Sequence, residues 1–406
     1  MKILSYLNVS NVDDIECDSG YIFNYTIASE LSSRGVRVDI IFPSELRGRI
    51  NKISSDSQHF VEMGHTKYEV RYHFSWNELK RLIELLQPDV IFLNQAELTA
   101  HMKALLVEMG LDQAIKIVSY CHYPALHLND DGKPCKDYSL DNGGLGEDII
   151  DNLFSALNIA DLFFVQSNFA KRLLLDYANS NNKPIKKEIY ILSPPYDNCL
   201  NDVPVLTKKR NAVLYNHRLY DSYGTREFID FVCSNSEFDF IVTDPMINRG
   251  SDRSRFNSSP TVNRISLMEQ QNVKVVDGSR RSSYIEAIDS CKVAIAPYRR
   301  ACVWSMAVVD CFCRGLPVIG PDFAAFVELI PEFLRYKTPA EERTILRRLL
   351  NDSDFWNEST YSCRKILDSI SPAVIVDSLL CFSYINVNRR MISVVPFAFS
   401  RFSSPR

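Results

Sequence analysis

Short apolar runs rich in β-favouring residues alternate with segments of helical periodicity from the first residue onward. Most of these runs are largely apolar on both faces, which is typical of strands buried between helices on both sides of a sheet. The pattern therefore predicts successive βαβ units and an α/β fold with parallel sheets. In the first half of the chain we expect strands at Lys2–Leu7, Val36–Phe42, Asp89–Asn94, Lys116–Tyr120, Leu162–Gln166 and Glu188–Leu192.

The first βαβ unit shows the pattern most clearly. Apolar residues recur at helical spacing over Tyr21–Arg34, and Gly35 follows as a stop signal. The polar loop before this helix leaves the carboxyl end of the first strand, which is where ligands bind in open α/β sheets. Its last residues, Asp18, Ser19 and Gly20, are therefore candidates for binding a substrate.

A second series of strands follows a polar connection at Ser193–Lys209 and predicts a second doubly wound domain. We expect domains at 1–200 and 201–380 and a tail at 381–406, and for Met246–Gln271 either a long surface loop or a disordered segment. The last helix is a candidate to return and brace the first domain. The second series comprises strands at Ala212–Asn216, Phe238–Thr243, Val273–Val276, Ala294–Ala296 and Pro317–Gly320, and helices at Arg226–Cys233, Ser283–Ser290, Ala307–Arg314 and Ala324–Leu329.

Composition changes this picture little. The 406 residues suffice for two globular domains, and the formal net charge of −4 gives no global cationic field for non-specific nucleic-acid binding. The 11 cysteines form no CxxC pair, which is typical of reduced thiols. Because no apolar stretch reaches signal-peptide or membrane-span length, we predict a cytoplasmic protein, and peripheral membrane contact remains open.

Candidate chemistry concentrates in residues 292–331. A strand, a loop and a helix follow one another there, and the backbone amides at Ser305 and Met306 would begin that helix. Helix N-termini bind anions, so a diphosphate fits this position. Asp310 is the only carboxylate on the helix, and it could accept hydrogen bonds from a ribose. A solvent-facing aspartate is the alternative.

This acid-bearing helix, together with Gly315, the run Leu316-Pro317-Val318-Ile319 and Gly320-Pro321, resembles the donor-binding signature of retaining GT-B glycosyltransferases of the sucrose synthase and glycogen synthase type. The resemblance implies two Rossmann-like domains facing a cleft, a nucleotide-diphosphate sugar as co-substrate, and no metal or cofactor. Two glutamates of that family lie eight positions apart. Asp310 matches the second, which holds the ribose, and Cys302 stands where the first contacts the transferred sugar.

The start of the second domain resembles the family's diphosphate clamp. Arg218 follows the strand, and Gly224 opens the next helix. A guanidinium offers a fixed fork of donors for phosphate, so Arg218 is the expected ligand. The family's second cation would stand at Tyr223. The triplet Asn216-His217-Arg218 and residues 321–331 are also similar to glycosyltransferases that mannosylate tRNA queuosine.

Three further segments resemble motifs of the family and occur in the same order along the chain. Gly278, Ser279 and Arg280 stand where the nucleobase is wrapped, although a plain βα turn is an alternative. His122 matches a histidine that points into the cleft near the sugar, and a structural histidine is the alternative. Tyr123, beside it, is a candidate for acceptor binding, as are Asp18–Gly20. Ser167 and Asn168 are expected to cap the following helix.

The leading functional hypothesis is retaining transfer of a hexosyl or pentosyl group, without metal, to a glycan or a lipid-linked sugar, with Arg218 and His122 as catalytic residues. Two alternatives remain. One is a GT-B protein that binds a ligand without catalysis, because Cys302 and Tyr223 stand where the family has charged groups. The other is transfer of the sugar to a base in tRNA or in hydroxymethylated phage DNA. It is motivated by arginines at Arg249, Arg253, Arg255, Arg264, Arg280, Arg281, Arg299 and Arg300.

Overall fold

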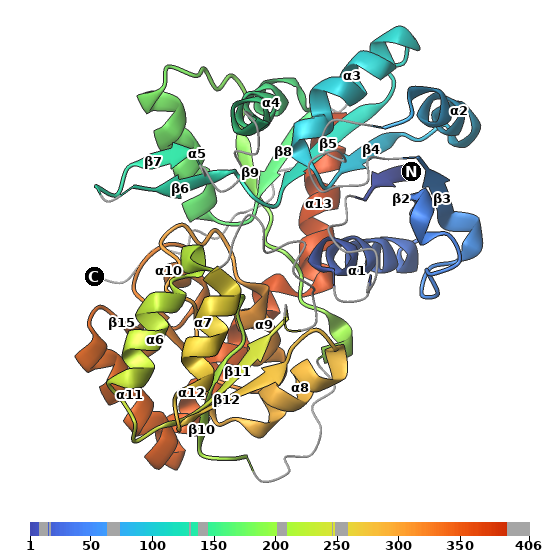
Figure 1. Cartoon of the computed structure of the whole chain (residues 1–406). Helices are drawn as coiled ribbons and strands as arrows, with labels where there is room; N and C mark the ends of the chain where they lie inside the picture. Colours follow the sequence, from blue (N-terminus) through green and yellow to red (C-terminus); the bar gives the residue numbers. More distant parts are fainter. Residues whose placement is uncertain are drawn as a thin grey trace.

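The computed structural model describes residues 1–7, 15, 18–62, 74–129, 131–136, 145–200, 209–245, 247 and 259–387. Two lobes lie one above the other in Figure 1, each built on a parallel β-sheet. The first lobe holds a seven-stranded sheet in the order β3-β2-β1-β4-β5-β8-β9, and the second holds a six-stranded sheet in the order β12-β11-β10-β13-β14-β15. The α/β prediction is confirmed.

The strands predicted from apolar runs all occur, with ends shifted by no more than one residue. The first sheet comprises β1 (Lys2–Tyr6), β2 (Arg37–Pro43), β3 (Gln58–Val61), β4 (Val90–Leu93), β5 (Lys116–Cys121), β8 (Leu162–Val165) and β9 (Ile189–Ile191). The second comprises β10 (Ala212–Tyr215), β11 (Asp239–Asp244), β12 (Val273–Asp277), β13 (Val293–Ile295), β14 (Val318–Pro321) and β15 (Arg335–Tyr336). Strands β3 and β15, and an antiparallel hairpin of β6 (Leu126–Leu128) and β7 (Pro134–Lys136), were not predicted.

Helices cover the sheets between successive strands (Figure 1). Those of the first lobe are α1 (Ser19–Ser33), α2 (Trp76–Leu86), α3 (Thr99–Glu108), α4 (Leu145–Ile159) and α5 (Asn168–Ser180). Those that follow in the chain are α6 (Thr225–Cys233), α7 (Ser259–Met268), α8 (Arg281–Ser290), α9 (Met306–Cys313), α10 (Phe326–Leu329), α11 (Pro339–Asn351), α12 (Ser353–Leu367) and α13 (Pro372–Val387).

Each sheet reverses its strand order at one point, and this positions the site. Tyr6 of β1 lies between Ile41 of β2 and Leu93 of β4, so the order reverses beside β1. Leu214 of β10 lies between strands β11 and β13 in the same way. Loops that leave the carboxyl ends of such neighbouring strands diverge and open a crevice where ligands bind.

The predicted loop at Met246–Gln271 is partly wrong, because α7 occupies its second half. Apolar periodicity could not reveal this helix, because three of its apolar side chains face solvent and a polar one is buried. Val262, Ile265 and Met268 are 56%, 51% and 62% exposed, whereas Asn263 is 5% exposed and donates to the Leu219 carbonyl at 2.8 Å. Arg264 on the same helix pairs with the buried Asp244 at 3.0 Å. Residues 246 and 248–258 lie outside the described residues.

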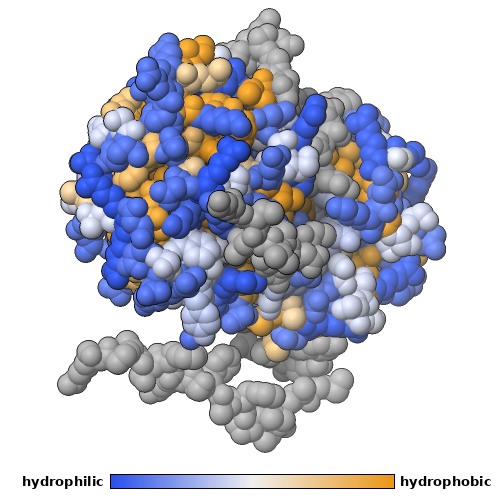
Figure 2. All heavy atoms as spheres, turned by 90° about the horizontal axis from the view of Figure 1, so that it is seen from below, coloured by the Kyte–Doolittle hydropathy of each residue, from blue (hydrophilic) through white to orange (hydrophobic). Residues whose placement is uncertain are grey.

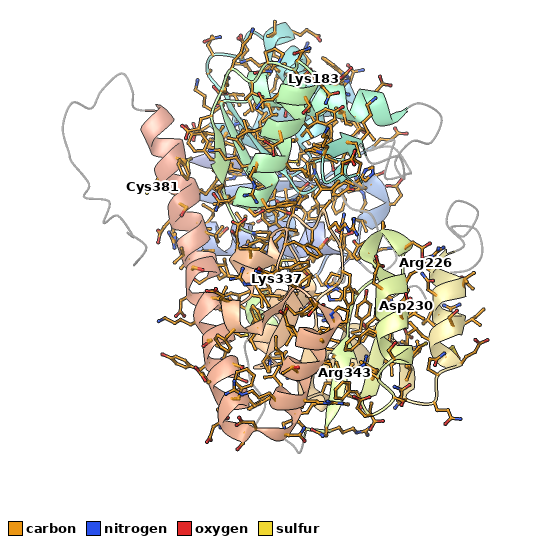
Figure 3. All side chains as sticks on the ribbon, turned by 90° about the vertical axis from the view of Figure 1, so that its left-hand side faces the viewer. Lys183, Arg226, Asp230, Lys337, Arg343 and Cys381 are labelled. Atoms are coloured by element: carbon orange, nitrogen blue, oxygen red, sulfur yellow. The ribbon has the colours of Figure 1, made fainter. Side chains whose placement is uncertain are left out.

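The last helix, α13, returns to the first lobe as the sequence suggested. Ile375, Val376 and Leu379 lie in the apolar core that contains α1, and Arg34 forms an ion pair with Asp377. Figure 3 shows Cys381 on this helix beside the first lobe. The domain limits at 200 and 380 stay a prediction, and residues 388–406 of the predicted tail are outside the described part.

The face of the second lobe that is seen from below is mainly hydrophilic, and its hydrophobic patches are separated by hydrophilic side chains (Figure 2). Among the helices that the structure describes, none combines the length and apolarity required to cross a bilayer.

Candidate functional site

A cavity of about 350 Å³ opens where the two lobes face each other. The first lobe contributes residues that follow β5, and the second contributes the start of α6 and the loop after β13. The lining residues are Tyr123, His127, Leu128, Asp221, Ser222, Gly224, Glu227, Tyr298, Arg299, Arg300 and Ala301. Of the predicted site residues, Tyr123 lines this cavity.

The loop after β10 is fixed to the first turn of α9. Asn216 Nδ2 donates to the Ala307 carbonyl at 3.1 Å and to the Tyr284 hydroxyl at 3.0 Å. His217 Nε2 lies 3.2 Å from the Ile295 carbonyl, and burial lowers the pKa of His217 to about 3, so its ring is neutral. Two residues of the Asn-His-Arg triplet are therefore structural.

Arg218, the third residue of the triplet, is exposed. Its backbone leaves the carboxyl end of β10, two residues after the contact that Asn216 makes with α9. Among the described residues the Arg218 side chain makes no ion pair. Its predicted contact with a diphosphate, shared with the amides at Ser305, stays a prediction.

Gly224 has a role that the sequence pattern did not explain. Its φ is +70°, and a Cβ added there would lie 2.5 Å from Tyr298 Cβ and 2.8 Å from the Tyr298 carbonyl oxygen. No side chain fits in this space. The glycine therefore lets the loop after β13 pack directly against the start of α6.

Ser305 is the N-cap of α9, as the predicted anion site requires. Its Oγ accepts from the Val308 amide at 3.4 Å, and the helix starts at Met306. The first amides of a helix have no acceptor within the helix and lie at the positive end of its dipole. The amides of Met306 and Ala307 precede the capped one, so this terminus can bind an anion.

Asp310 is buried on α9, which excludes the solvent-facing alternative. Its Oδ2 accepts from the Tyr284 hydroxyl at 2.9 Å and lies 3.8 Å from Arg281 Nη1. Burial raises the pKa of Asp310 to about 6, although Arg281 and Tyr284 oppose the shift. Arg281 also pairs with Asp197 at 3.1 Å.

The predicted nucleobase turn, Gly278–Arg280, is held by its own neighbours. The Gly278 amide donates to the Asp244 carbonyl at 3.1 Å, and a Cβ on Gly278 would lie 3.0 Å from Thr243 Cβ. The Ser279 amide and hydroxyl both donate to Asp277 Oδ1, at 2.8 and 2.6 Å. Arg280 is exposed. These contacts are those of a βα turn, and the base contact stays a prediction.

In the first lobe, the predicted acceptor residues at 18–20 begin helix α1. Asp18 Oδ1 accepts from the amides of Gly20 and Tyr21 at 2.9 and 3.1 Å, which makes it the N-cap of the helix. Ser19 is exposed. The carboxylate of Asp18 thus has a structural role, and its contact with an acceptor remains a prediction.

His122 directly follows β5 and packs edge-on against Phe23, with ring centroids 4.6 Å apart. The Tyr120 ring lies at the same centroid distance on another side. These contacts are those of the structural alternative, and the catalytic role of His122 stays a prediction. Tyr123, the next residue, faces the cavity and has its ring centroid 5.3 Å from Arg299 Cζ.

Cys302 cannot replace the glutamate that the family resemblance places there. It is buried, and its Sγ donates to the Trp304 carbonyl at 3.3 Å. Burial raises the pKa of the Cys302 thiol to about 11, so it carries no charge at neutral pH. The Ala325 amide donates to the Cys302 carbonyl at 3.0 Å, which fixes this end of the loop.

The lobes are joined by hydrogen bonds at the start of α5. Ser167 Oγ accepts from the Ala170 amide at 3.0 Å, which confirms the predicted cap, and donates to the Val303 carbonyl at 2.7 Å across the cleft. Glu328 of α10 accepts from the amides of Asn168 and Phe169 at 2.9 and 2.8 Å. A second-lobe carboxylate thus caps a first-lobe helix.

Sequence reasoning did not assign several of these residues to the site, although Arg281 and Arg299 were named among the clustered arginines. Arg281, Tyr284 and Asp197 surround Asp310, and Arg299 and Glu328 contact the first lobe. The paired arginines Arg280-Arg281, just before a predicted helix, and Arg299-Arg300 were local signals. The other contacts join residues far apart in the chain.

Residues 22–186 match the family model described as Glycosyltransferase Family 4. No curated protein matches the sequence. Among solved structures, sucrose-phosphate synthase from Thermosynechococcus elongatus is 13% identical, with 95% of this chain and 100% of that chain covered and a TM-score of 0.69.

Two further structures have the same architecture. A glycosyltransferase from Rickettsia africae is 13% identical, with 96% of this chain and 99% of that one covered and a TM-score of 0.61. Anabaena HepE in complex with UDP and glucose is 10% identical, with 95% and 100% covered and a TM-score of 0.66. The protein therefore has the GT-B fold with two Rossmann-like domains, and residues 22–186 of its first lobe are similar to the glycosyltransferase family 4 model.

Proposed function

We propose that the protein is a retaining glycosyltransferase that moves a hexosyl or pentosyl group from a nucleotide-diphosphate sugar to a hydroxyl of a glycan or a lipid-linked sugar. The observation that supports this best is the contact of Asn216 with Ala307, which holds the loop carrying Arg218 beside the N-terminus of α9. Donors for a diphosphate therefore leave neighbouring strands at one sheet edge. HepE, a structural neighbour, binds UDP and glucose.

The donor half of the mechanism follows from charge. When the sugar leaves, the diphosphate gains negative charge, which Arg218 and the amides at Ser305 and Met306 stabilise more as the bond breaks. Asp310 accepts a ribose hydroxyl through Oδ1, since the Tyr284 hydroxyl bonds to Oδ2. The turn Gly278–Arg280 contacts the base. No metal or cofactor enters this scheme.

The acceptor half rests on the resemblance stated above. The acceptor hydroxyl attacks from the face that the diphosphate leaves, and the departing phosphate takes its proton, so the sugar keeps its anomeric configuration. His122, Tyr123 and the start of α1 border the acceptor. The cavity between the lobes, which Tyr123 lines, gives the acceptor a place beside the donor.

A thermal-shift screen against UDP, GDP and ADP and their sugars tests the donor half. A ligand present at about 100 times its dissociation constant adds about 2.7 kcal/mol of stability, so one nucleotide should raise the melting temperature clearly. The labelled sugar of that donor should then appear in a membrane extract as a product of retained configuration. If no nucleotide stabilises the protein, the proposal fails.

Transfer to a nucleic-acid base has less support than transfer to a glycan. Of the arginines that motivated it, Arg264 pairs with buried Asp244 and Arg281 with Asp197. Arg249, Arg253 and Arg255 lie outside the described residues. Binding to tRNA or DNA that weakens steeply with added salt would revive this hypothesis. Purely non-catalytic binding is overturned if the purified protein transfers or hydrolyses the donor sugar.

A further inference from the structure

Arg299 lies in the cavity between two aromatic rings from different lobes. Its guanidinium carbon is 4.6 Å from the ring centroid of Tyr223 and 5.3 Å from that of Tyr123. Tyr223 precedes α6 in the second lobe, and Tyr123 follows β5 in the first. The two rings shield the cation from water, Tyr123 also forms a hydrogen bond with it, and the remaining donors of its fork can bind a ligand.

No carboxylate neutralises this cation among the residues that the structure describes. Of the two acids that line the same cavity, Asp221 pairs with Arg226 at 2.9 Å and accepts from Asn263 at 2.8 Å, and Glu227 forms no ion pair with Arg299. Figure 3 shows Arg226 on α6. A partly desolvated guanidinium without a counter-ion is costly, unless an anion from outside completes the site.

The backbone that carries Arg299 is anchored on both sides. Before it, the Tyr298 hydroxyl bonds to the buried carboxyl of Glu342, and Tyr298 packs on Gly224. After it, the Cys302 amide donates to the Arg299 carbonyl at 3.1 Å. The cation is therefore positioned before a ligand arrives, so binding costs little reorganisation.

The Arg299 cation lies beside a position where the resemblance implies a positive charge that this sequence lacks. Tyr223 stands where the diphosphate clamp of similar glycosyltransferases would have its second cation, and a tyrosine supplies no charge. Here the positive charge comes from a different loop and lies on the Tyr223 ring. Ser222 and Glu227 line the same cavity and can bond to sugar hydroxyls.

We propose that Arg299 is a phosphate-binding residue that replaces the missing cation of the clamp and contacts a phosphoryl group borne by a sugar in this cavity. The inference rests on the proposed function and extends it to one residue. The phosphoryl group belongs either to the diphosphate of the donor or to a phosphorylated sugar acceptor. Both share the same recognition chemistry, and two probes distinguish them.

Calorimetric titration of the full chain with pyrophosphate and with glucose 6-phosphate tests the proposal. Arg299→Gln should weaken binding of one probe about 10- to 100-fold, the scale of a lost charged hydrogen bond. A loss for pyrophosphate assigns the donor, and a loss for glucose 6-phosphate assigns the acceptor. Arg348→Gln is the matched control, because Arg348 also stacks on a ring, Phe355, at 3.8 Å but is not among the cavity-lining residues.

A double variant distinguishes an effect of the lost charge from an effect of impaired folding. In Arg299→Gln, the added change Tyr223→Lys should restore most of the lost affinity, since it returns a cation to the clamp position. If Arg299→Gln folds and binds both probes like the unaltered protein, or if that unaltered protein binds neither, the proposal is overturned. In the latter case a nucleotide that still raises the melting temperature would leave the proposed glycosyltransferase function intact.

Discussion

The two lobes present the same edge of a parallel sheet to the cleft but use it differently. In the second lobe a continuous polar network runs from Asn216 through Tyr284 to Asp310 and leaves Arg218 exposed. In the first lobe, Asp18 caps its own helix and His122 packs against rings. In the proposed scheme, donor recognition is therefore built into the framework, whereas the groups available to an acceptor are few.

This difference matches the chemistry of the two proposed substrates. A diphosphate has a fixed shape and charge, so helix amides and a guanidinium suffice to recognise it. An acceptor is bound by shape and scattered hydroxyl contacts. The five predictions below test the contrast, beginning with the largest effect.

Loss of the exposed cation should affect activity most. Arg218→Ala is expected to remove about 2–4 kcal/mol of transition-state stabilisation, on the scale of a lost charged donor, with little change in folding because Arg218 is exposed. Turnover with the donor identified by thermal shift measures this. Arg347→Ala, which removes an exposed arginine paired with Glu237, is the control. Unchanged turnover in Arg218→Ala would refute the assignment.

Adding a side chain at Gly224 should destabilise the folded protein. Gly224→Ala places a Cβ within 2.5 Å of Tyr298, in addition to straining a φ of +70°, so we expect a loss of about 3 kcal/mol in the free energy of unfolding. Gly110→Ala is the matched control, because Gly110 has a φ of +68° and nothing within 4 Å of its added Cβ. Urea denaturation should give that control a loss of about 1 kcal/mol. Equal losses would contradict the packing argument.

Nucleotide affinity should depend on pH through Asp310. Its pKa is raised to about 6, so the carboxyl is mostly protonated at pH 5 and ionised at pH 7. A carboxylate accepts a ribose hydroxyl better than a carboxylic acid does, so affinity should rise by up to about 10-fold over this range. Asp310→Asn should flatten the profile. A profile that stays as steep in the variant would assign the dependence to another group.

The raised pKa of Asp310 also predicts how the stability of the folded protein changes with pH. Because the folded pKa of Asp310 is raised, the folded state holds the proton more tightly than the unfolded chain does. The stability of the unaltered protein relative to Asp310→Asn should therefore fall as pH rises from about 4 through 6. Thermal midpoints across this range measure the difference, and a rise with pH would contradict the assignment.

The smallest effect is expected at the contact between lobes. Glu328→Gln keeps the size of the side chain but replaces a charged acceptor at the amides of Asn168 and Phe169. We expect a loss of about 1 kcal/mol in stability, the usual scale of one hydrogen bond. Glu332→Gln, on a neighbouring surface turn, should change the thermal midpoint less. Equal shifts would mean that the interlobe bonds contribute nothing measurable.

Local signals in the sequence predicted the framework well. Strand β4 is apolar at every position and β5 is largely so, because helices cover both faces of the sheet, and this pattern can be recognised without knowledge of the fold. The cap at Ser167 and the start of α9 at Ser305 were also predicted, because capping depends on neighbouring residues. Helix α7 was missed because it buries Asn263 and exposes Val262, Ile265 and Met268, leaving Leu267 as a buried apolar residue.

The chemistry around these elements was less predictable. Asp310 could be named from its place on a helix, but its partner Tyr284 is 26 residues away and reaches it only through the fold. The stack of Arg299 between Tyr223 and Tyr123 joins three separate loops. Such contacts depend on how the sheets are arranged, so no local pattern reveals them.

A structure with a bound nucleoside diphosphate would test the central claim most directly. The account predicts that the phosphates lie at the carboxyl edge of the second sheet, within hydrogen-bonding distance of both the Arg218 guanidinium and the Met306 amide. A diphosphate bound elsewhere, or one that touches neither group, would contradict it.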